Sequence, residues 1–226
     1  MEIYYLPGMF TGELDSNQNQ KFESVGTLDI ETNGFDGAQN ELVGIALGYY
    51  EPEYDTAEIE VISRGKIPDE EALIRSAYSW LNRRSPDSLA TYNGTEFDFV
   101  FLNDRIETLG LSPPPTLDCI SQHVDLFTPR KRVANQSNRK WPTLEESLAT
   151  YEIPVHLTEW EGSELNNTRF GEDFAPKYLT AIDQGNKSAI SRLENTLLEY
   201  AASDAEATLA LYAADSGNEY IPTYSY

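Results

Sequence analysis

Short apolar runs separated by turn signals fill the first half of the chain, a pattern typical of β-strands. The first three runs are rich in β-branched and aromatic residues and follow one another closely, and Asn33-Gly34 marks the first turn. We therefore expect them to pair as an antiparallel meander. The predicted strands span residues 25–30, 42–50, 56–62 and 88–92, and the pattern is also compatible with a short strand at 115–118.

Apolar residues that recur at helical spacing predict the helices. Thr143 and Glu146 form a capping-box pattern at the start of one of them. Strands followed by alternating helices and strands indicate the α/β class, with a mixed sheet of five to six strands flanked by helices. Residues 151–180 follow no pattern that assigns them a structure, and 133–138 resembles an exposed loop. One predicted helix begins at Pro68. The others span residues 97–109, 120–127, 143–149 and 188–214.

Length and composition indicate one globular domain over residues 1–226. The chain is 40% hydrophobic and 12% aromatic, which is enough to bury a sizeable core. Residues 1–23 are expected to form an N-terminal extension with a strand and a loop, and 217–226 a tyrosine-rich tail. No membrane-spanning run or signal peptide is visible. The single cysteine, Cys119, suits a reducing compartment, so we expect a cytoplasmic protein.

Four acidic side chains lie in segments whose geometry would point them to one place. Residues alternate faces along a strand, so Asp29 and Glu31 project from the same side of the first predicted strand. Residues four apart share one face of a helix, so Tyr200 and Asp204 lie one turn apart. Asp98 follows the fourth strand. Four converging carboxylates would repel one another unless divalent cations lay between them, which predicts a two-metal site.

The three segments, in this order, carry a family resemblance. Asp-Ile-Glu-Thr at 29–32, Tyr-Asn-Gly-x-x-Phe-Asp-Phe at 92–99 and Tyr-x-x-x-Asp at 200–204 resemble the three motifs of the DEDD 3′–5′ exonucleases. The likeness is closest to the proofreading domain of family B DNA polymerases and implies a ribonuclease-H-like fold. A related subclass has histidine five residues before the last aspartate, where this chain has Glu199. The chain therefore looks like the tyrosine subclass.

The resemblance also implies a role for each of these residues. Asp29 would bridge two divalent cations, and Glu31 and Asp204 would bind the ion on the nucleophile side. Asp98 would hold the second ion, partly through water. An all-oxygen ligand set suits Mg²⁺ or Mn²⁺. Tyr200 would orient the attacking water, because a pKa of about 10 makes tyrosine a poor base at neutral pH.

Contacts to the substrate are open at three positions. Asn93 and Phe97 match family positions near the 3′ end of the substrate, but a turn-forming asparagine and a core phenylalanine fit the sequence equally well. Thr32 follows the first acid pair, where it would hydrogen-bond the terminal nucleotide or simply end a strand. Glu96 matches no family acid and is expected to face solvent.

Basic residues gather in one short segment between the second and third motifs. In family B polymerases this region lies near the single strand, so the segment is expected to grip a nucleic-acid backbone, with a tryptophan available to stack on a base. The alternative is a solvated loop whose cations offset nearby acids. The residues are Arg130, Lys131, Arg132, Arg139, Lys140 and Trp141.

The net charge of −22 is unusual for a protein that would bind nucleic acid, because such domains generally carry a basic patch. Molar salt shortens the Debye length to about 3 Å and screens the repulsion between surface acids. Ten arginines against six lysines also fit a halophilic protein. We therefore expect a halophilic archaeal or archaeal-virus source, with an ordinary acidic mesophilic protein as the alternative.

The expected function is removal of nucleotides from the 3′ end of single-stranded DNA, with RNA as an open alternative. No polymerase segment follows the last motif, so we expect a stand-alone domain that serves repair or trimming, or that a polymerase recruits. A second hypothesis is a catalytically idle nucleic-acid-binding subunit, but all four acids and the tyrosine are present. A third is a structural protein with acids as surface decoration. An uncompensated charge in the apolar strand around Asp29 disfavours this third hypothesis.

Overall fold

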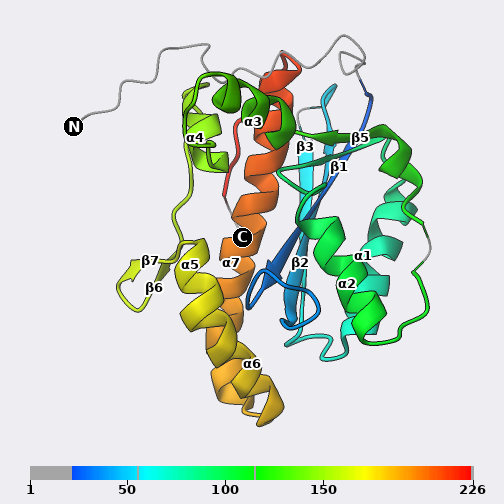
Figure 1. Cartoon of the computed structure of the whole chain (residues 1–226), viewed down its shortest axis with the longest axis vertical. Coiled ribbons are helices and arrows are strands. Elements are labelled where there is room, and N and C mark those ends of the chain that lie inside the picture. The colour runs from blue at the N-terminus through cyan, green and yellow to red at the C-terminus, as the bar shows by residue number, and fades with distance from the viewer. Residues whose placement is uncertain (1–21, 55, 115, 225–226) are drawn as a thin grey trace.

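The structure, a computed structural model, describes residues 22–54, 56–114 and 116–224, so most of the expected N-terminal extension lies outside the described residues. A mixed sheet forms its centre, with the strand order β3-β2-β1-β4-β5 (Figure 1). The first three strands form the expected antiparallel meander, whereas β4 and β5 run parallel to β1. The strands are β1 Val25–Thr32, β2 Leu42–Glu51, β3 Thr56–Ser63, β4 Ser88–Thr91 and β5 His123–Asp125.

Helices cover both faces of this sheet, which confirms the expected α/β class. Helices α1 (Glu70–Arg84) and α2 (Asp98–Thr108) pack on one face, and the long helix α7 (Lys187–Asp215) crosses the other (Figure 1). No helix among the described residues has the length and apolarity to span a membrane. The other helical segments are η1 Asp118–Gln122, α3 Phe127–Gln136, α4 Leu144–Ala149, α5 Asn167–Arg169, the π-helix η2 Phe170–Phe174 and α6 Ala175–Asp183.

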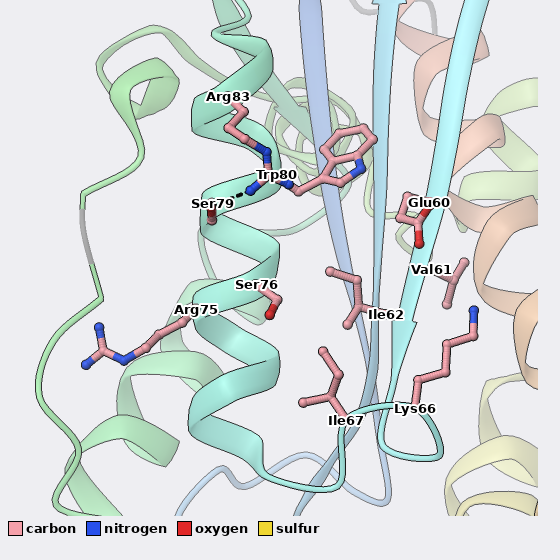
Figure 2. Close-up of a pocket in the computed structure, with 10 residues that line it drawn as sticks. All are labelled: Glu60, Val61, Ile62, Lys66, Ile67, Arg75, Ser76, Ser79, Trp80 and Arg83. Atoms are coloured by element: carbon pink, nitrogen blue, oxygen red, sulfur yellow. Dashed lines mark hydrogen bonds between the residues drawn. The ribbon is translucent and has the colours of Figure 1, made fainter.

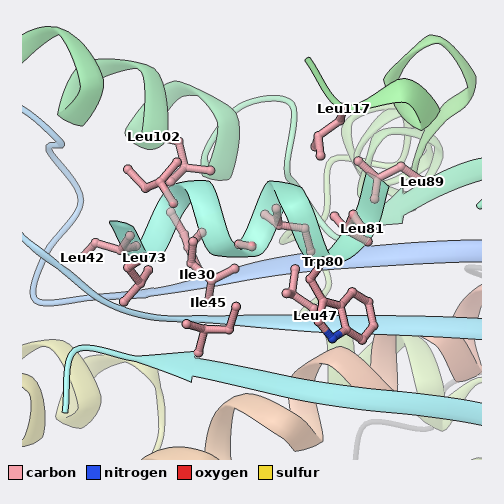
Figure 3. Packing of buried hydrophobic residues seen from close by; sticks show 14 of the residues in the cluster. Ile30, Leu42, Ile45, Leu47, Leu73, Trp80, Leu81, Leu89, Leu102 and Leu117 are labelled. Carbon is pink, nitrogen blue, oxygen red and sulfur yellow. The ribbon is translucent and has the colours of Figure 1, made fainter. Parts of the chain in front are cut away.

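The core on the α1 face follows from the two periodicities in the sequence. Leu28 and Ile30 of β1 point to this face, and the apolar stripe of α1 packs over them together with α2 (Figure 3). Asp69 caps α1 by accepting the backbone N–H of Ala72 at 2.8 Å. Each fully buried leucine or isoleucine contributes about 1.5–3 kcal/mol, so this layer anchors β1 in the sheet.

The opposite face of the sheet carries unusually small side chains where α7 crosses it. Gly44, Ala46 and Gly48 occupy every second position of β2, on the side of the strand that faces α7. Ala201 and Ala205 of α7 pack against this stripe. Because β2 presents no large side chain at these three positions, α7 packs closely on the strand.

Gly48 is the tightest point of this contact. A Cβ atom at this position would lie 2.7 Å from Cγ2 of Thr27 and 2.8 Å from Cδ1 of Leu209, and both distances are below normal contact. A Cβ atom at Gly44 would meet its nearest neighbour, the carbonyl oxygen of Ile62, at 3.4 Å. At Gly48 a methyl group would therefore overlap both Thr27 of β1 and Leu209 of α7, whereas at Gly44 it would lie in ordinary contact.

Two expectations for the segment between α2 and α3 are wrong. Residues 116–118 form no strand, and 120–127 is not one helix, because η1 ends at Gln122 and β5 follows it. Val124 of β5 is buried and pairs with Ala90 of β4. Pairing with the sheet thus decides a conformation that a three-residue run does not signal.

The exposed loop expected at 133–138 is largely helical. Helix α3 continues to Gln136, and only Ser137 and Asn138 lie beyond its end. Ala134 is buried, so one side of the helix packs on the core. The capping box of Thr143 and Glu146 at the start of α4 is confirmed.

Residues that the sequence left unassigned are ordered along α7. Residues 151–180 include a hairpin of β6 (Glu159–Trp160) and β7 (Ser163–Glu164), followed by α5, η2 and most of α6. The described part of the tail, 217–224, also packs on α7. The carboxylate of Glu206 accepts hydrogen bonds from the hydroxyl of Tyr220 and from the backbone N–H groups of Thr223 and Tyr224.

A groove of about 430 Å³ lies between α1 and the edge strand β3 (Figure 2). Ile62, Ile67 and Trp80 line it together with Glu60, its one acidic lining residue. Arg75 points away from the strand. A single carboxylate does not make a two-metal site, and none of the four candidate acids lines this groove.

Replacement of the two stripe glycines by alanine tests the tight packing of α7. We expect Gly48→Ala to lower the free energy of unfolding by about 1–3 kcal/mol, because the added methyl group overlaps Thr27 and Leu209. Gly44→Ala, on the same strand and face, should change it by less than about 1 kcal/mol. Urea unfolding of both variants measures the difference, and equal losses would contradict this account of the stripe.

Candidate active site

Asp29 and Glu31 project from β1 toward α7, on the side opposite to Leu28 and Ile30. Their register partners on β2 are Ala46 for Asp29 and Gly44 for Glu31. These small partners leave room above the strand for two carboxylates. Glu31 is buried and Asp29 is half-buried.

Asp98 lies where the sheet opens next to β1. Strand β1 pairs with β4 only from Val25 to Thr27. Beyond this point Asp98, the first residue of α2, takes the place of a neighbouring strand. Its Oδ1 atom accepts the backbone N–H of Ile30 at 3.1 Å. This hydrogen bond fixes the Asp98 carboxylate at the edge of β1, near Asp29.

A buried acid that sequence analysis did not single out shapes the loop before Asp98. The carboxylate of Asp125, at the end of β5, accepts the backbone N–H groups of Asn93, Thr95 and Phe127, each at 3.0 Å. Asn93 has a φ of 70°, in the left-handed region that asparagine enters more readily than most residues. An aspartate at a strand end was the available signal, since this residue type often bonds to the backbone of a turn.

Helix α7 brings Asp204 onto the two acids of β1. Carboxylate oxygens of Asp29, Glu31 and Asp204 lie within 4.8 Å of one another. Oε1 of Glu31 is buried and has no hydrogen-bond partner among the described residues. Within the same residues, no lysine or arginine forms an ion pair with any of the four acids. Converging oxygens without a protein partner fit a divalent cation such as Mg²⁺ or Mn²⁺.

Burial raises the pKa of all four carboxyl groups. It brings the pKa of Asp29 to about 7. The pKa of Glu31 is raised by burial first and then by the negative charges of the other three acids. Burial and the charge of Asp29 likewise raise the pKa values of Asp98 and Asp204. A bound cation would counter this repulsion and favour the ionised carboxylates.

Tyr200 lies one turn before Asp204 and is held from two sides. Its hydroxyl donates a hydrogen bond to Oδ1 of Asn167 at 2.6 Å, and its ring stacks on Phe170 with 4.8 Å between centroids. Burial, followed by the charges of Asp204 and Glu31, raises the pKa of Tyr200 well above its ordinary value. The phenol is therefore protonated at neutral pH and cannot serve as a base.

The three expected substrate contacts lie at the ends of β1 and β4. The hydroxyl of Thr32 donates to the carbonyl oxygen of Gly34 at 2.6 Å, which closes the turn after β1. Oδ1 of Asn93 is buried and has no partner among the described residues. Phe97 packs edge-on against Phe35 at 6.1 Å. Phe35 is 84% exposed, and sequence analysis missed it although it is a large apolar residue directly after a turn.

Arg130 lies in the interior, which corrects the expectation that it grips a nucleic-acid backbone. Its guanidinium donates to both carboxylate oxygens of Asp215 at 2.7 Å and to the carbonyl oxygen of Leu126 at 2.8 Å. Both side chains of the ion pair are fully buried. Arg130 therefore ties α3 to the end of α7.

The remaining residues of the basic segment lie at the surface, and we refer to them as the α3 basic group. Lys131 forms an ion pair with Glu96 and lies 4.3 Å from the ring of Trp141, which is 47% exposed. Glu96 is exposed, as expected, and precedes Asp98 by two residues. The group therefore borders the loop that positions Asp98. It consists of Lys131, Arg132, Arg139, Lys140 and Trp141.

Comparison with known proteins places this architecture. The RNase_H_2 model of the RNase_H superfamily matches residues 27–214, a range that includes the four acids and Tyr200. The chain belongs to the RNase_H superfamily. Membership supports nuclease activity on a nucleic acid and the use of divalent metals. A comparison with curated proteins finds no match.

A solved structure repeats the fold of this RNase_H superfamily member. It is the structure of the family B DNA polymerase from the hyperthermophilic archaeon Pyrobaculum calidifontis, with a TM-score of 0.56 and 18% sequence identity. The match covers 84% of this chain and 24% of the polymerase chain. The chain thus spans about a quarter of that protein's length, and at this identity the likeness shows the fold.

Metal binding should stabilise the protein more at high pH than at low pH. The raised pKa values favour protonated acids in the metal-free fold, so their stabilising contribution is present below the unfolded pKa of about 4. It is lost as pH rises through about 7, the folded pKa of Asp29. A cation competes with these protons. At about 100 times its Kd, Mn²⁺ should add about 2.7 kcal/mol, or about 5–10 °C in Tm.

Thermal unfolding with and without Mn²⁺, at about pH 6 and about pH 8, measures this effect. We expect the shift in Tm to grow with pH and to disappear in Asp29→Asn, which keeps the side-chain shape and removes the charge. A shift that is equal at both pH values, or that persists in Asp29→Asn, would argue against this site.

Proposed function

We propose that this chain is a metal-dependent 3′–5′ exonuclease of the tyrosine DEDD subclass that acts on single-stranded DNA. One observation carries the proposal. Carboxylate oxygens of Asp29, Glu31 and Asp204 converge within 4.8 Å from a strand and a helix, while Oε1 of Glu31 has no partner among the described residues. Superfamily membership and the position of Tyr200, one turn before Asp204, support the same assignment.

The acids divide between two cation positions by analogy with the exonuclease motifs. Glu31 and Asp204 would hold the ion on the side of the attacking water, and Asp98 the ion on the side of the leaving group. Asp29 would be shared by both. When bound, two such ions lower the pKa of the attacking water and stabilise charge on the attacking and leaving oxygens.

The reaction releases one nucleotide at a time from the 3′ end. The water oxygen bonds to the terminal phosphorus, the bond from phosphorus to the 3′ oxygen breaks, and that oxygen takes up a proton. The products are a nucleoside 5′-monophosphate and a strand with a new 3′ hydroxyl. Tyr200 is protonated, so its part is to orient the water by a hydrogen bond.

Residues around the acids supply a path for the strand. Phe97 and the exposed Phe35 offer aromatic surfaces against which the terminal bases would stack. Oδ1 of Asn93, which has no partner among the residues that the structure describes, would accept a hydrogen bond from the terminal nucleotide. Farther along the nucleic-acid strand, the α3 basic group would contact backbone phosphates. In a chain of net charge −22, this group of four basic residues, of which Lys131 pairs with Glu96 and Lys140 with Glu146, would mark the side on which the nucleic acid enters.

A cleavage assay tests the proposal directly. 5′-labelled single strands of DNA and RNA of one sequence would be incubated with the protein in concentrated KCl and Mn²⁺ or Mg²⁺. We expect a ladder that shortens from the 3′ end, and a loss of about 10³-fold or more in Asp204→Asn, because the ions contribute several kcal/mol to the transition state. Glu199→Gln, on the same helix but bonded to His156, should keep its activity.

The outcomes of this assay separate the hypotheses. Faster cleavage of RNA would replace DNA as the substrate. No cleavage of either strand, together with retained binding, would indicate an idle nucleic-acid-binding subunit. Internal cuts, or activity that survives in Asp204→Asn, would refute a 3′–5′ exonuclease at this site.

The α3 basic group should act on binding and leave the chemical step unchanged. Alanine at both Arg139 and Lys140 should raise KM with little change in kcat, because backbone contacts are made equally in the ground and transition states. The slope of log binding constant against log salt concentration should fall by about one to two units. Steady-state kinetics across a salt series measures both quantities. Arg192→Ala, on an exposed part of α7, is the control, and an equal effect there would mean nonspecific attraction.

A further inference from the structure

The hydroxyl group of Tyr200 has one hydrogen, and the structure gives it a partner outside the acid cluster. That hydrogen points to Oδ1 of Asn167, at an oxygen–oxygen distance of 2.6 Å. The Tyr200 ring is fixed as well, because it stacks on Phe170 with an angle of 18° between the ring planes. The position of the phenol and the direction of its hydrogen bond are therefore set by Phe170 and Asn167.

This segment is built to stay in place. The side chain of Asn166 accepts the backbone N–H of Arg169 at 3.0 Å and so begins α5. The guanidinium of Arg169 donates to carbonyl oxygens of the β6–β7 hairpin, at Trp160, Ser163 and Glu164. Asn167 therefore lies in a short helix whose capping residue, Asn166, and last residue, Arg169, are both held by hydrogen bonds.

The segment also reaches the end of β1. The helix widens into the π-helix η2 at Phe170–Phe174, a local form that often occurs at functional sites. A Cβ atom on Gly171 would lie 4.0 Å from the carbonyl oxygen of Thr32, so the backbone passes over the strand end that follows Asp29 and Glu31. Phe170 and Phe174 are buried in one cluster with Tyr200. Asn167, Phe170 and Gly171 therefore lie along one side of the candidate site.

We propose that Asn167 is a positioning residue that fixes Tyr200 as a hydrogen-bond acceptor toward the attacking water. A phenol whose only hydrogen is donated to an amide oxygen presents lone pairs to its other neighbours. The water then donates a hydrogen to Tyr200 and keeps its own lone pair free for the phosphorus. Asn167 takes part in no bond that forms or breaks. The inference rests on the proposed exonuclease function and adds a residue from a segment that the motifs do not include.

Steady-state kinetics of Asn167→Ala, Tyr200→Phe and the double variant test this coupling. We expect Asn167→Ala to lower kcat about 3- to 10-fold with KM unchanged, the size of one oriented hydrogen bond. In the Tyr200→Phe background the same substitution should have no further effect, because there is no hydroxyl left to orient. Thr168→Ala, the exposed neighbour in α5, should leave kcat unchanged. Equal losses in both backgrounds, or a change in KM alone, would overturn the proposal.

A second measurement reads the contact without substrate or metal. In protein labelled with ¹³C at tyrosine Cζ, the Tyr200 signal is identified by its absence in Tyr200→Phe. Asn167→Ala should shift this signal and Thr168→Ala should not. An unmoved signal in Asn167→Ala overturns the contact whatever the activity. A wild-type chain without exonuclease activity refutes the proposed function, and the catalytic role of Asn167 with it, even where the NMR signal shifts as expected.

Discussion

Helix α7 can approach the sheet closely because the middle of β2 faces it with Gly44, Ala46 and Gly48, and Ala201 and Ala205 of α7 pack in this region. Carboxylates are short, so acids on a strand and a helix converge only where the two backbones come near each other. Protein interiors are packed as densely as organic crystals, and a single added methyl group is transmitted through such a contact. The convergence of Asp204 with the acids of β1 is therefore a property of the packing interface as much as of the acids.

Among the described residues, other buried acids have basic side chains or N–H and O–H groups as partners. Within that part of the chain, Asp29, Glu31, Asp98 and Asp204 have no basic side chain beside them. Asp215 accepts hydrogen bonds from the two terminal nitrogens of the Arg130 guanidinium, and Glu70 pairs with Arg105 and Arg64. Asp125 and Glu206 are satisfied by backbone N–H groups, Glu206 also by the hydroxyl of Tyr220. Such partners offset the cost of taking a charge out of water. Among the described residues, the acids around Asp29 lack a cationic partner, and this contrast separates a site prepared for a cation from acids that stabilise the fold.

Much of this arrangement could be predicted from sequence, because it depends on local periodicity. The period of a strand places Asp29 and Glu31 on one face, and the period of a helix places Tyr200 above Asp204. The errors lie where distant contacts decide. β5 is a strand because Val124 pairs with Ala90, and the same sequence read alone resembled part of a helix.

The other misses have the same physical origin. Arg130 is buried because Asp215, 85 residues later, lies beside it, and no local pattern reports that pairing. Asn167 lies in the unassigned segment 151–180 and contacts Tyr200, which is 33 residues later in the sequence. Segments that form short or irregular elements, such as the π-helix after α5, depend almost wholly on what they pack against.

The carboxylate of Asp98 accepts the N–H of Ile30 where β1 has lost its neighbouring strand, a structural role that is separate from the proposed binding of a cation. A chain without catalytic activity would still need an acceptor at this position, because the buried N–H of Ile30 would otherwise be left without a hydrogen bond. Glu31 has no such structural role, because its buried Oε1 bonds to nothing among the described residues. In chains that share this fold, an aspartate in the second motif is therefore weak evidence of enzymatic activity. Loss of the glutamate of the first motif would be the clearer sign of an inactive enzyme.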